Sequence, residues 1–214
     1  MAERALIVFA RVPRRGRVKS RLAAGIGEDR ALDAYRKMLV DTLATCASVQ
    51  GACSLLCLEG EDVDGECAAL AARFGMQIAR QRPGDLGRRM HAALAAQLAA
   101  GRLPVLVGCD CPPLAAADLE AAFDALRTAD AVFGATEDGG YALVGIRREL
   151  PEAFEGPAWG SDSVMRSTRE ALRARGASWI ELRTLWDVDD LAGYRRWLAW
   201  RRENRGGRGG DAGG

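Results

Sequence analysis

The 214-residue sequence predicts a three-layer α/β/α fold built on a mostly parallel, mixed β-sheet. One observation is that short β-rich runs alternate with helical stretches along most of the chain. A second is that strand candidates such as residues 104–108 are continuously apolar, as expected for strands buried on both faces. A third is the absence of any repeat or internal linker. We therefore predict one domain over residues 1–200, followed by a disordered Gly/Arg-rich tail over residues 201–214.

The expected elements follow in order along the chain. Strands are predicted at residues 6–9, 54–58, 76–79, 104–108, 131–133, 141–146 and 178–182. Helices are predicted at residues 31–46, 67–74, 86–100, 118–127, 162–175 and 191–200. Ala31, Tyr35, Met38 and Leu39 recur at helical spacing, and Gly75 gives the second helix a natural end. A basic loop over residues 11–20 separates the first strand from the first helix.

Composition narrows the functional classes. The formal net charge is +1, so the overall charge does not favour a nucleic-acid or membrane partner. The first apolar run, Ala5–Ala10, is too short for a signal core or a membrane span, so we expect a cytoplasmic protein. Six cysteines form no zinc-type pair and are expected as reduced thiols. The single histidine, His91, lies on a predicted helix, which argues against a Ser-His-Asp triad. A homodimer is left open.

In open α/β sheets, ligands bind beyond the carboxyl ends of the strands, so polar residues at those ends are candidates. The loop Arg11–Arg21 carries six cations and one glycine directly after a buried strand. Backbone amides and cations suit phosphate binding. The loop lacks the spacing of a Walker A or dinucleotide motif, and a solvated basic loop is the alternative.

Asp110 follows the most apolar predicted strand, within Gly-Cys-Asp-Cys-Pro-Pro. A carboxylate at a buried strand end needs a cation or hydrogen-bond donors. Mg²⁺ and Mn²⁺ prefer such oxygen ligands, so a divalent metal is one interpretation. The other is a turn or helix-capping role before Pro112. Cys109 and Cys111 point away from Asp110 along the strand direction and are expected to pack.

Three further segments could contribute to the site. Residues 137–141, Glu-Asp-Gly-Gly-Tyr, suit a ligand that approaches the backbone, or form a tight turn. Residues 187–190, Asp-Val-Asp-Asp, follow the last predicted strand. One interpretation is that they provide a second carboxylate ligand for the metal, and the other is that they cap the last helix. Trp159 lies in a predicted loop, where it could line a substrate site.

Six short segments carry a family resemblance: FARVPRRGRVKSRL (Phe9–Leu22), RPGDLGRRM (Arg82–Met90), VGCDCPPL (Val107–Leu114), EDGGYALVG (Glu137–Gly145), the Trp159-Gly-Ser stretch and DVDDL (Asp187–Leu191). In this order they resemble an uncharacterised bacterial family of small GT-A-fold transferases, related to nucleotide-diphospho-sugar transferases. The resemblance runs from about residue 5 to about residue 200. Cys109 stands where this family more usually has serine, and Asp190-Leu-Ala replaces a Thr-Pro-containing helix start.

The resemblance implies a role for each matching residue. The nucleotide would be held by Arg11, Gly16, Lys19, Arg21, Gly84, Asp85 and Arg89. The metal would be held by Asp110 and Asp189. The acceptor side would be lined by Glu137, Asp138, Gly139, Gly140, Tyr141 and Trp159. The catalytic residues would be Asp138 as the general base, with Glu137 and Lys19.

These assignments predict a transferase that uses Mg²⁺ or Mn²⁺, a nucleotide-activated donor and a small-molecule acceptor. Our first interpretation is transfer of a sugar from a nucleotide diphosphate sugar. The alternative is a nucleotidyltransferase that joins a nucleoside triphosphate to a phosphorylated small molecule. Residues 17–21, Arg-Val-Lys-Ser-Arg, also resemble the loop of guanylyltransferases with this fold. A non-catalytic binding module is a third hypothesis, disfavoured by carboxylates at three separate strand ends.

Overall fold

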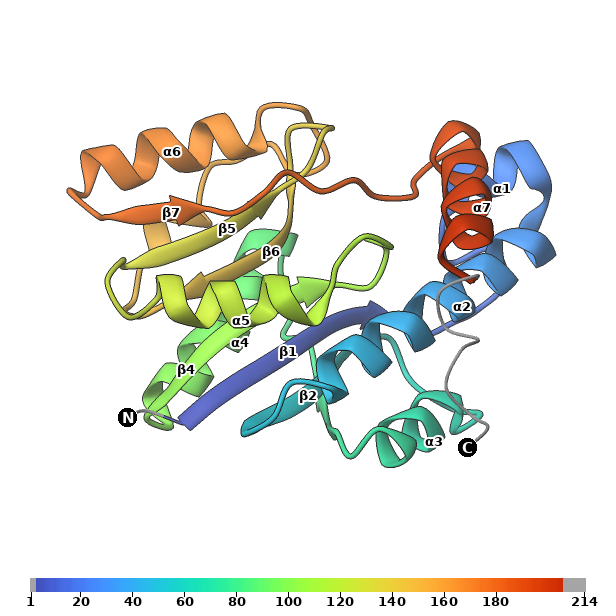
Figure 1. The fold of residues 1–214 in the computed structure, drawn as a ribbon, viewed down its shortest axis with the longest axis horizontal. Coiled ribbons are helices and arrows are strands. Elements are labelled where there is room, and N and C mark those ends of the chain that lie inside the picture. The colour runs from blue at the N-terminus through green and yellow to red at the C-terminus, as the bar shows by residue number, and fades with distance from the viewer. Residues whose placement is uncertain (1–2, 206–214) are drawn as a thin grey trace, which may run out of the picture.

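A seven-stranded mixed sheet forms the centre of the structure, a computed structural model that describes residues 3–205 (Figure 1). The strands are β1 (Glu3–Arg11), β2 (Ala52–Glu59), β3 (Gln77–Arg80), β4 (Arg102–Gly108), β5 (Ala131–Ala135), β6 (Tyr141–Ile146) and β7 (Trp179–Glu181). The helices are α1 (Ser20–Ile26), α2 (Glu28–Ala47), α3 (Glu66–Arg73), α4 (Leu86–Ala99), α5 (Ala116–Ala125), α6 (Val164–Ala174) and α7 (Leu191–Arg205), with one 3₁₀ turn, η1 (Pro151–Ala153).

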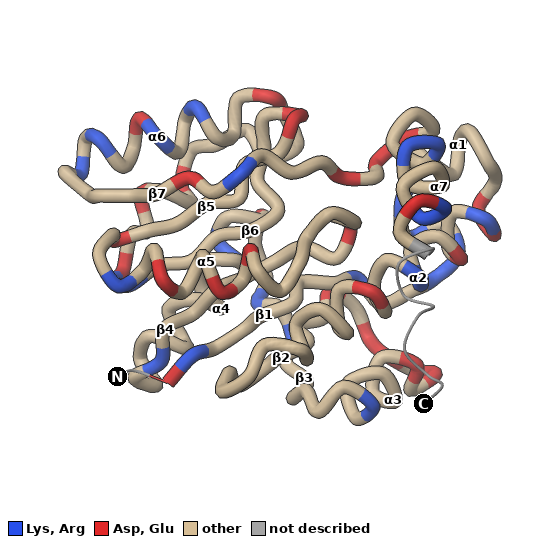
Figure 2. Tube along the Cα trace, viewed as in Figure 1, with Lys and Arg blue, Asp and Glu red and all other residues tan. Residues whose placement is uncertain are grey.

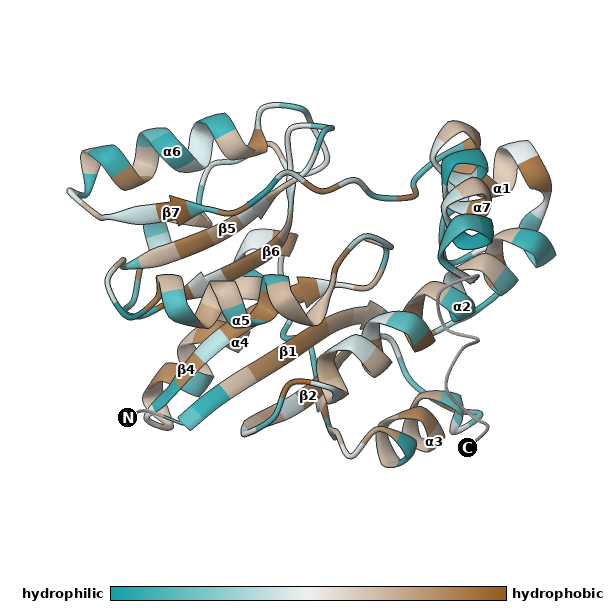
Figure 3. Cartoon of the chain, viewed as in Figure 1, coloured by the Kyte–Doolittle hydropathy of each residue, from teal (hydrophilic) through white to brown (hydrophobic). Residues whose placement is uncertain are grey.

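The strand order is β3-β2-β1-β4-β6-β5-β7. Only β6 runs antiparallel to its neighbours among the described strands. The central strands are hydrophobic along most of their length (Figure 3), because both faces of the sheet are covered. The predicted α/β fold with a mostly parallel mixed sheet is confirmed.

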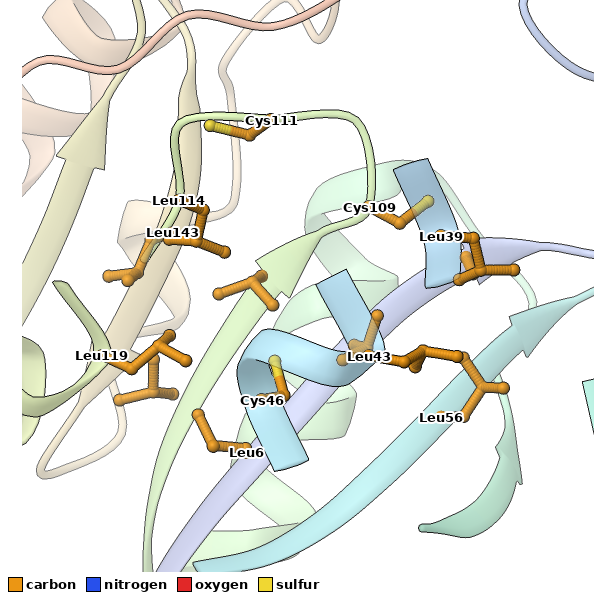
Figure 4. Packing of buried hydrophobic residues seen from close by; sticks show 14 of the residues in the cluster. Leu6, Leu39, Leu43, Cys46, Leu56, Cys109, Cys111, Leu114, Leu119 and Leu143 are labelled. Atoms are coloured by element: carbon orange, nitrogen blue, oxygen red, sulfur yellow. The ribbon is translucent and has the colours of Figure 1, made fainter. Parts of the chain in front are cut away.

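Successive residues of β1 divide the core into two layers. Leu6 and Val8 pack with α2, α3 and α5 on one face, whereas Ile7 and Phe9 pack with α4 and α6 on the other. Figure 4 shows the first layer, where Leu39 and Leu43 of α2 lie over the sheet. Alternate residues of a strand point to opposite faces, so one buried strand supplies both layers.

A third apolar cluster lies outside these two layers and positions the C-terminal part of the chain. It joins Leu22 of α1, Met38 of α2 and Trp197 of α7 to Trp186 and Val188. The last two belong to residues 182–190, the connection between β7 and α7, here called the strap (Figure 1). The strap is therefore held by packing as well as by its ends.

Several element boundaries differ from the prediction. The seven-residue helix α1 was not predicted; Lys19, at φ 50°, precedes it and Gly27, at φ 84°, ends it. Helix α7 continues to Arg205, so the tail predicted to begin at residue 201 was placed too early. The remaining tail, residues 206–214, lies outside the described residues. No helix within residues 3–205 has the length and apolar character needed to cross a membrane.

Candidate active site

A cavity of about 520 Å³ opens at the carboxyl ends of β1 and β4. This is where the strand-end rule places a ligand. Ten of the residues predicted for the site line the cavity: Arg11, Lys19, Arg21, Arg89, Asp110, Asp138, Gly140, Tyr141, Trp159 and Asp189. The structure thus brings together residues from most of the chain.

Lys19 lies at the acidic end of this cavity. Its Nζ donates to Asp110 Oδ2 at 2.8 Å and to Asp189 Oδ1 at 2.7 Å, and its side chain is only 6% exposed. Burial by itself lowers the pKa of Lys19, but the two carboxylates outweigh it and raise that pKa above its ordinary value. Lys19 is also the one non-glycine residue of the described chain with a positive φ. Such backbone strain is typical of functional positions.

The strap brings its acidic residues to Asp110. The backbone amide of Val188 donates to the Asp110 carbonyl at 3.0 Å, so the strap runs directly beside the end of β4. Val188 is fully buried, and its neighbours Asp187 and Asp189 line the cavity instead. Figure 2 shows acidic positions along this connection. Asp190 lies beyond them and accepts the Gly193 amide, capping α7.

Asp187 carries a strongly perturbed carboxyl in the cavity. Burial raises its pKa to about 7, and the nearby charges of Asp110, Asp138 and Asp189 add to the rise. Within residues 3–205, no lysine or arginine forms an ion pair with Asp187. A group of carboxylates that share one ammonium is short of positive charge, and a bound cation would relieve that deficit.

The opposite end of the cavity is preorganised around Glu59. Its Oε2 accepts Arg11 Nε at 2.8 Å and Arg89 Nη1 at 3.0 Å, and these two guanidinium groups outweigh burial to lower the pKa of Glu59. Gln81 accepts Arg89 Nη1 and donates to the carbonyls of Ala10 and Cys57. Arg89 is therefore fixed in position at the ends of β1 and β2.

Two aromatic side chains, Tyr141 and Trp159, form one wall of the cavity. Tyr141 and Trp159 meet edge to face, with ring centroids 6.1 Å apart. The phenol oxygen of Tyr141 is buried without a hydrogen-bond partner among the described residues, and burial raises its pKa well above the usual range. Close packing behind the wall depends on Gly87, because a Cβ there would lie 2.1 Å from the Phe154 carbonyl oxygen and 2.6 Å from the Trp159 ring.

Replacing Gly87 by alanine should therefore displace the loop that carries Trp159. We expect a loss of about 1–3 kcal/mol of stability, the usual result of overpacking, and a raised KM for substrate. Thermal denaturation and steady-state kinetics measure both. Gly25→Ala on α1 is the control, since the nearest atom to its Cβ would be Leu191 Cβ at 3.3 Å. A Gly87→Ala protein as stable as the wild type, with the same KM, would contradict this account of the wall.

Five predicted site residues do not line the cavity. Glu137 pairs with Arg196 at 2.6 Å and 3.0 Å on the exposed surface. Asp85 caps α4 by accepting the Arg88 amide. Gly139 packs against the backbone of the segment before α6, where a Cβ would lie 2.1 Å from the Asp162 oxygen. The other two, Gly16 and Gly84, are turn residues with positive φ.

The structure adds residues that sequence reasoning did not select: Tyr35, Glu59, Gln81 and, as a cavity carboxylate, Asp187. Glu59 directly follows the strand predicted at residues 54–58, and Gln81 lies two residues beyond the strand predicted at 76–79. The strand-end rule applied to every strand would therefore have found both. Tyr35 gave no such signal. Its hydroxyl donates to the Arg11 carbonyl at 2.8 Å and accepts the Arg11 amide at 2.7 Å.

The carboxylate oxygens of the cavity fit a divalent ion whose coordination shell is completed by a bound substrate. Among the described residues, no three acidic, histidine or cysteine side chains are already close enough to enclose an ion. Mg²⁺ commonly takes only one or two carboxylates and completes its shell with water and substrate phosphates. The cavity lining holds four cations and five carboxylates, so an anionic substrate needs added positive charge there. Asp110, Asp187 and Asp189 are the residues that would hold it.

Comparisons with known proteins found related sequences and structures. The profile of a family described as an uncharacterized protein conserved in bacteria (DUF2064) matches residues 42–161. The 3-phospho-D-glycerate guanylyltransferase of Phenylobacterium zucineum (strain HLK1) is 36% identical over 166 residues, which make up 75% of this chain and 73% of that protein.

Solved structures show the same fold. One from Desulfovibrio desulfuricans G20, provisionally named a nucleotide-diphospho-sugar transferase, is 30% identical with a TM-score of 0.81 over 96% of each chain. Another, from Mycobacterium tuberculosis H37Rv and solved as a complex with manganese, is 20% identical with a TM-score of 0.57. It covers 92% of this chain and 98% of its own.

Proposed function

Because the chain belongs to the bacterial DUF2064 family and is a transferase, we propose that it transfers a nucleotidyl group from a nucleoside triphosphate to a small phosphorylated acid. The observation that carries the proposal is the convergence of Asp110, Asp187 and Asp189 around Lys19, in a cavity that also contains three arginines. The guanylyltransferase name of the 36%-identical relative favours GTP as donor and 3-phospho-D-glycerate as the first acceptor to test.

Charge balance explains what the residues do. A phosphate oxygen of the acceptor attacks the α-phosphorus of the triphosphate, the bond between the α-phosphorus and its bridging oxygen breaks, and pyrophosphate leaves. Lys19 and Arg21 stabilise the negative charge that develops on the leaving group. A bound Mg²⁺ or Mn²⁺ would neutralise phosphate charge and act as a Lewis acid. Arg11 and Arg89, fixed by Glu59, supply positive charge at the other end of the cavity.

Sugar transfer, our first interpretation from the sequence, is the second candidate. The provisional name of the 30%-identical structure favours it, and so does Asp138, which lines the cavity as the predicted general base. Asp138 Oδ1, however, already accepts the Thr136 hydroxyl at 2.5 Å and the Gly140 amide at 3.1 Å. One of its two carboxylate oxygens is thus already occupied by hydrogen bonds within the protein.

The two candidates predict different results for Asp138→Asn. An acceptor phosphate, whose second pKa is about 6, is already ionised at neutral pH and needs no general base. Under nucleotidyl transfer we therefore expect kcat to fall less than tenfold. Under sugar transfer to a hydroxyl, loss of the base should lower kcat by about 10²- to 10⁴-fold. Asp110→Asn should abolish turnover in either case, and it verifies that the assay reports this site.

A thermal-shift panel tests the donor class and the metal together. Binding to the folded state raises the melting temperature by mass action. We expect GTP to stabilise the protein with Mg²⁺ or Mn²⁺ present and to have much less effect without either ion. Stabilisation by nucleotide diphosphate sugars and not by any triphosphate would favour sugar transfer, and an effect independent of the ion would refute the metal site.

A further inference from the structure

The strap carries two of the three clustered carboxylates, yet it contains no helix or strand of its own. Its conformation must be fixed by contacts with the rest of the protein. One such contact is the hydrogen bond from the Val188 amide to the Asp110 carbonyl. A second group of contacts is made by Arg183, four residues before Asp187.

Arg183 joins the strap to the segment that follows Asp110. Its Nε and Nη2 donate to Asp118 Oδ1 and Oδ2, each at 2.6 Å, and Nη2 also donates to the Pro113 carbonyl at 2.6 Å. Asp118 lies in the first turn of α5, and its side chain is only 8% exposed. The Pro113 carbonyl is three residues beyond Asp110 along the same loop. One planar guanidinium group thus holds both the helix start and the Asp110 loop.

The far end of the strap has a different anchor. Arg196 of α7 pairs with Glu137, but these side chains are 48% and 55% exposed. Exposed ion pairs contribute little because water screens them. Both pairs are two-pronged, but only the Arg183–Asp118 pair has a buried partner, so it is the stronger of these two ion pairs.

We propose that Arg183 is a positioning residue, which, through Asp118 and the Pro113 carbonyl, holds Asp187 and Asp189 against Asp110. It does not touch the cavity and acts only through the strap. Without Arg183, Asp118 would lose its buried ion pair and keep only the hydrogen bond from the Ala115 amide. The strap would keep its packing, the backbone hydrogen bonds of Leu182, Leu185 and Val188, and the ion pair of Asp189 with Lys19, but nothing among the described residues would join it to the loop that follows Asp110 at Pro113. The role in assembling an ion site rests on the proposed function; the role in holding the strap does not.

Hydrogen exchange and Mn²⁺ binding test the two parts separately. In Arg183→Ala we expect the Val188 amide to exchange at least tenfold faster than in the wild type. We expect the Kd for Mn²⁺, measured by electron paramagnetic resonance with GTP present, to rise at least tenfold. Arg169→Ala is the matched control: it removes a two-pronged pair with Glu181 that lies off the cavity, and neither quantity should change.

Two further variants keep the test decisive if Arg183→Ala does not fold. Arg183→Lys keeps the charge without the planar fork, so it should restore the Mn²⁺ affinity only in part. Asp118→Asn should reproduce the effects of Arg183→Ala from the other side of the pair. Unchanged exchange at Val188 would overturn the proposal, and so would faster exchange with unchanged Mn²⁺ affinity. A wild-type protein that binds no Mn²⁺ with GTP would instead overturn the proposed function, and with it the role of Arg183 in the ion site.

Discussion

Replacing Lys19 by methionine should lower kcat by about 10³-fold, the upper range for loss of one charged group that stabilises a transition state. The ammonium of Lys19 is the cation shared by Asp110 and Asp189, and it is the buried positive charge of the cavity's acidic end. Methionine fills similar space but supplies no charge. It would leave Asp110, Asp187 and Asp189 facing one another and an incoming triphosphate.

The same variant should also lose stability. Removing one member of a buried ion pair commonly costs 3–5 kcal/mol, but Asp110 and Asp189 are 35% and 46% exposed, so we expect about 2 kcal/mol. Steady-state kinetics and thermal denaturation measure the two effects. The chain offers a matched control in Lys37, its only other lysine, which is exposed on α2. A Lys19→Met enzyme that keeps more than a tenth of wild-type turnover would remove Lys19 from the mechanism.

Asp187→Asn should separate stability from function. An unfolded aspartate loses its proton near pH 4, whereas the folded pKa of Asp187 is about 7. Between these values the folded protein binds a proton that the unfolded chain does not. The proton bound by Asp187 therefore contributes fully to the free energy of unfolding below about pH 4. This contribution falls as the pH rises to about 7 and no longer changes above that pH.

In the absence of divalent ions, the melting temperature of the wild type should thus fall between pH 5 and pH 8. Asp187→Asn should lose most of that fall and be the more stable protein at pH 8, while its Kd for Mn²⁺ with GTP rises at least tenfold. Asp190→Asn, which changes an acid that caps α7, should retain the wild-type pH dependence. Identical melting curves for wild type and Asp187→Asn across this range would show that Asp187 does not bear the repulsion assigned to it.

The site could be located from the sequence because it lies at the end of a regular strand. Residues 104–108 are continuously apolar, so they had to form a buried strand, and Asp110 had to lie near its carboxyl end. The predicted partner Asp189 does converge on the same point, although 79 residues separate the two in the sequence. Helical spacing identified α2 in the same way, to within three residues of its start.

Residues outside regular elements were harder to place. In the strap, Trp186 and Val188 turn inward because they pack with α1, α2 and α7, and only that tertiary packing directs Asp187 and Asp189 to the cavity. Glu137 and Asp138 are adjacent, yet Arg196, 59 residues away, draws Glu137 off the site. Nothing in the local sequence predicts these long-range contacts.

The fate of labelled phosphorus tests the central claim most directly. Purified protein is incubated with Mg²⁺, 3-phospho-D-glycerate and GTP labelled at either the α- or the γ-phosphorus. Nucleotidyl transfer predicts that the α-label appears in a product joined to the acceptor by a diphosphate bond, while the γ-label appears in pyrophosphate. If neither label moves with any triphosphate or phosphorylated acid, and a nucleoside diphosphate is released from a nucleotide sugar, the protein transfers sugars and the account is contradicted.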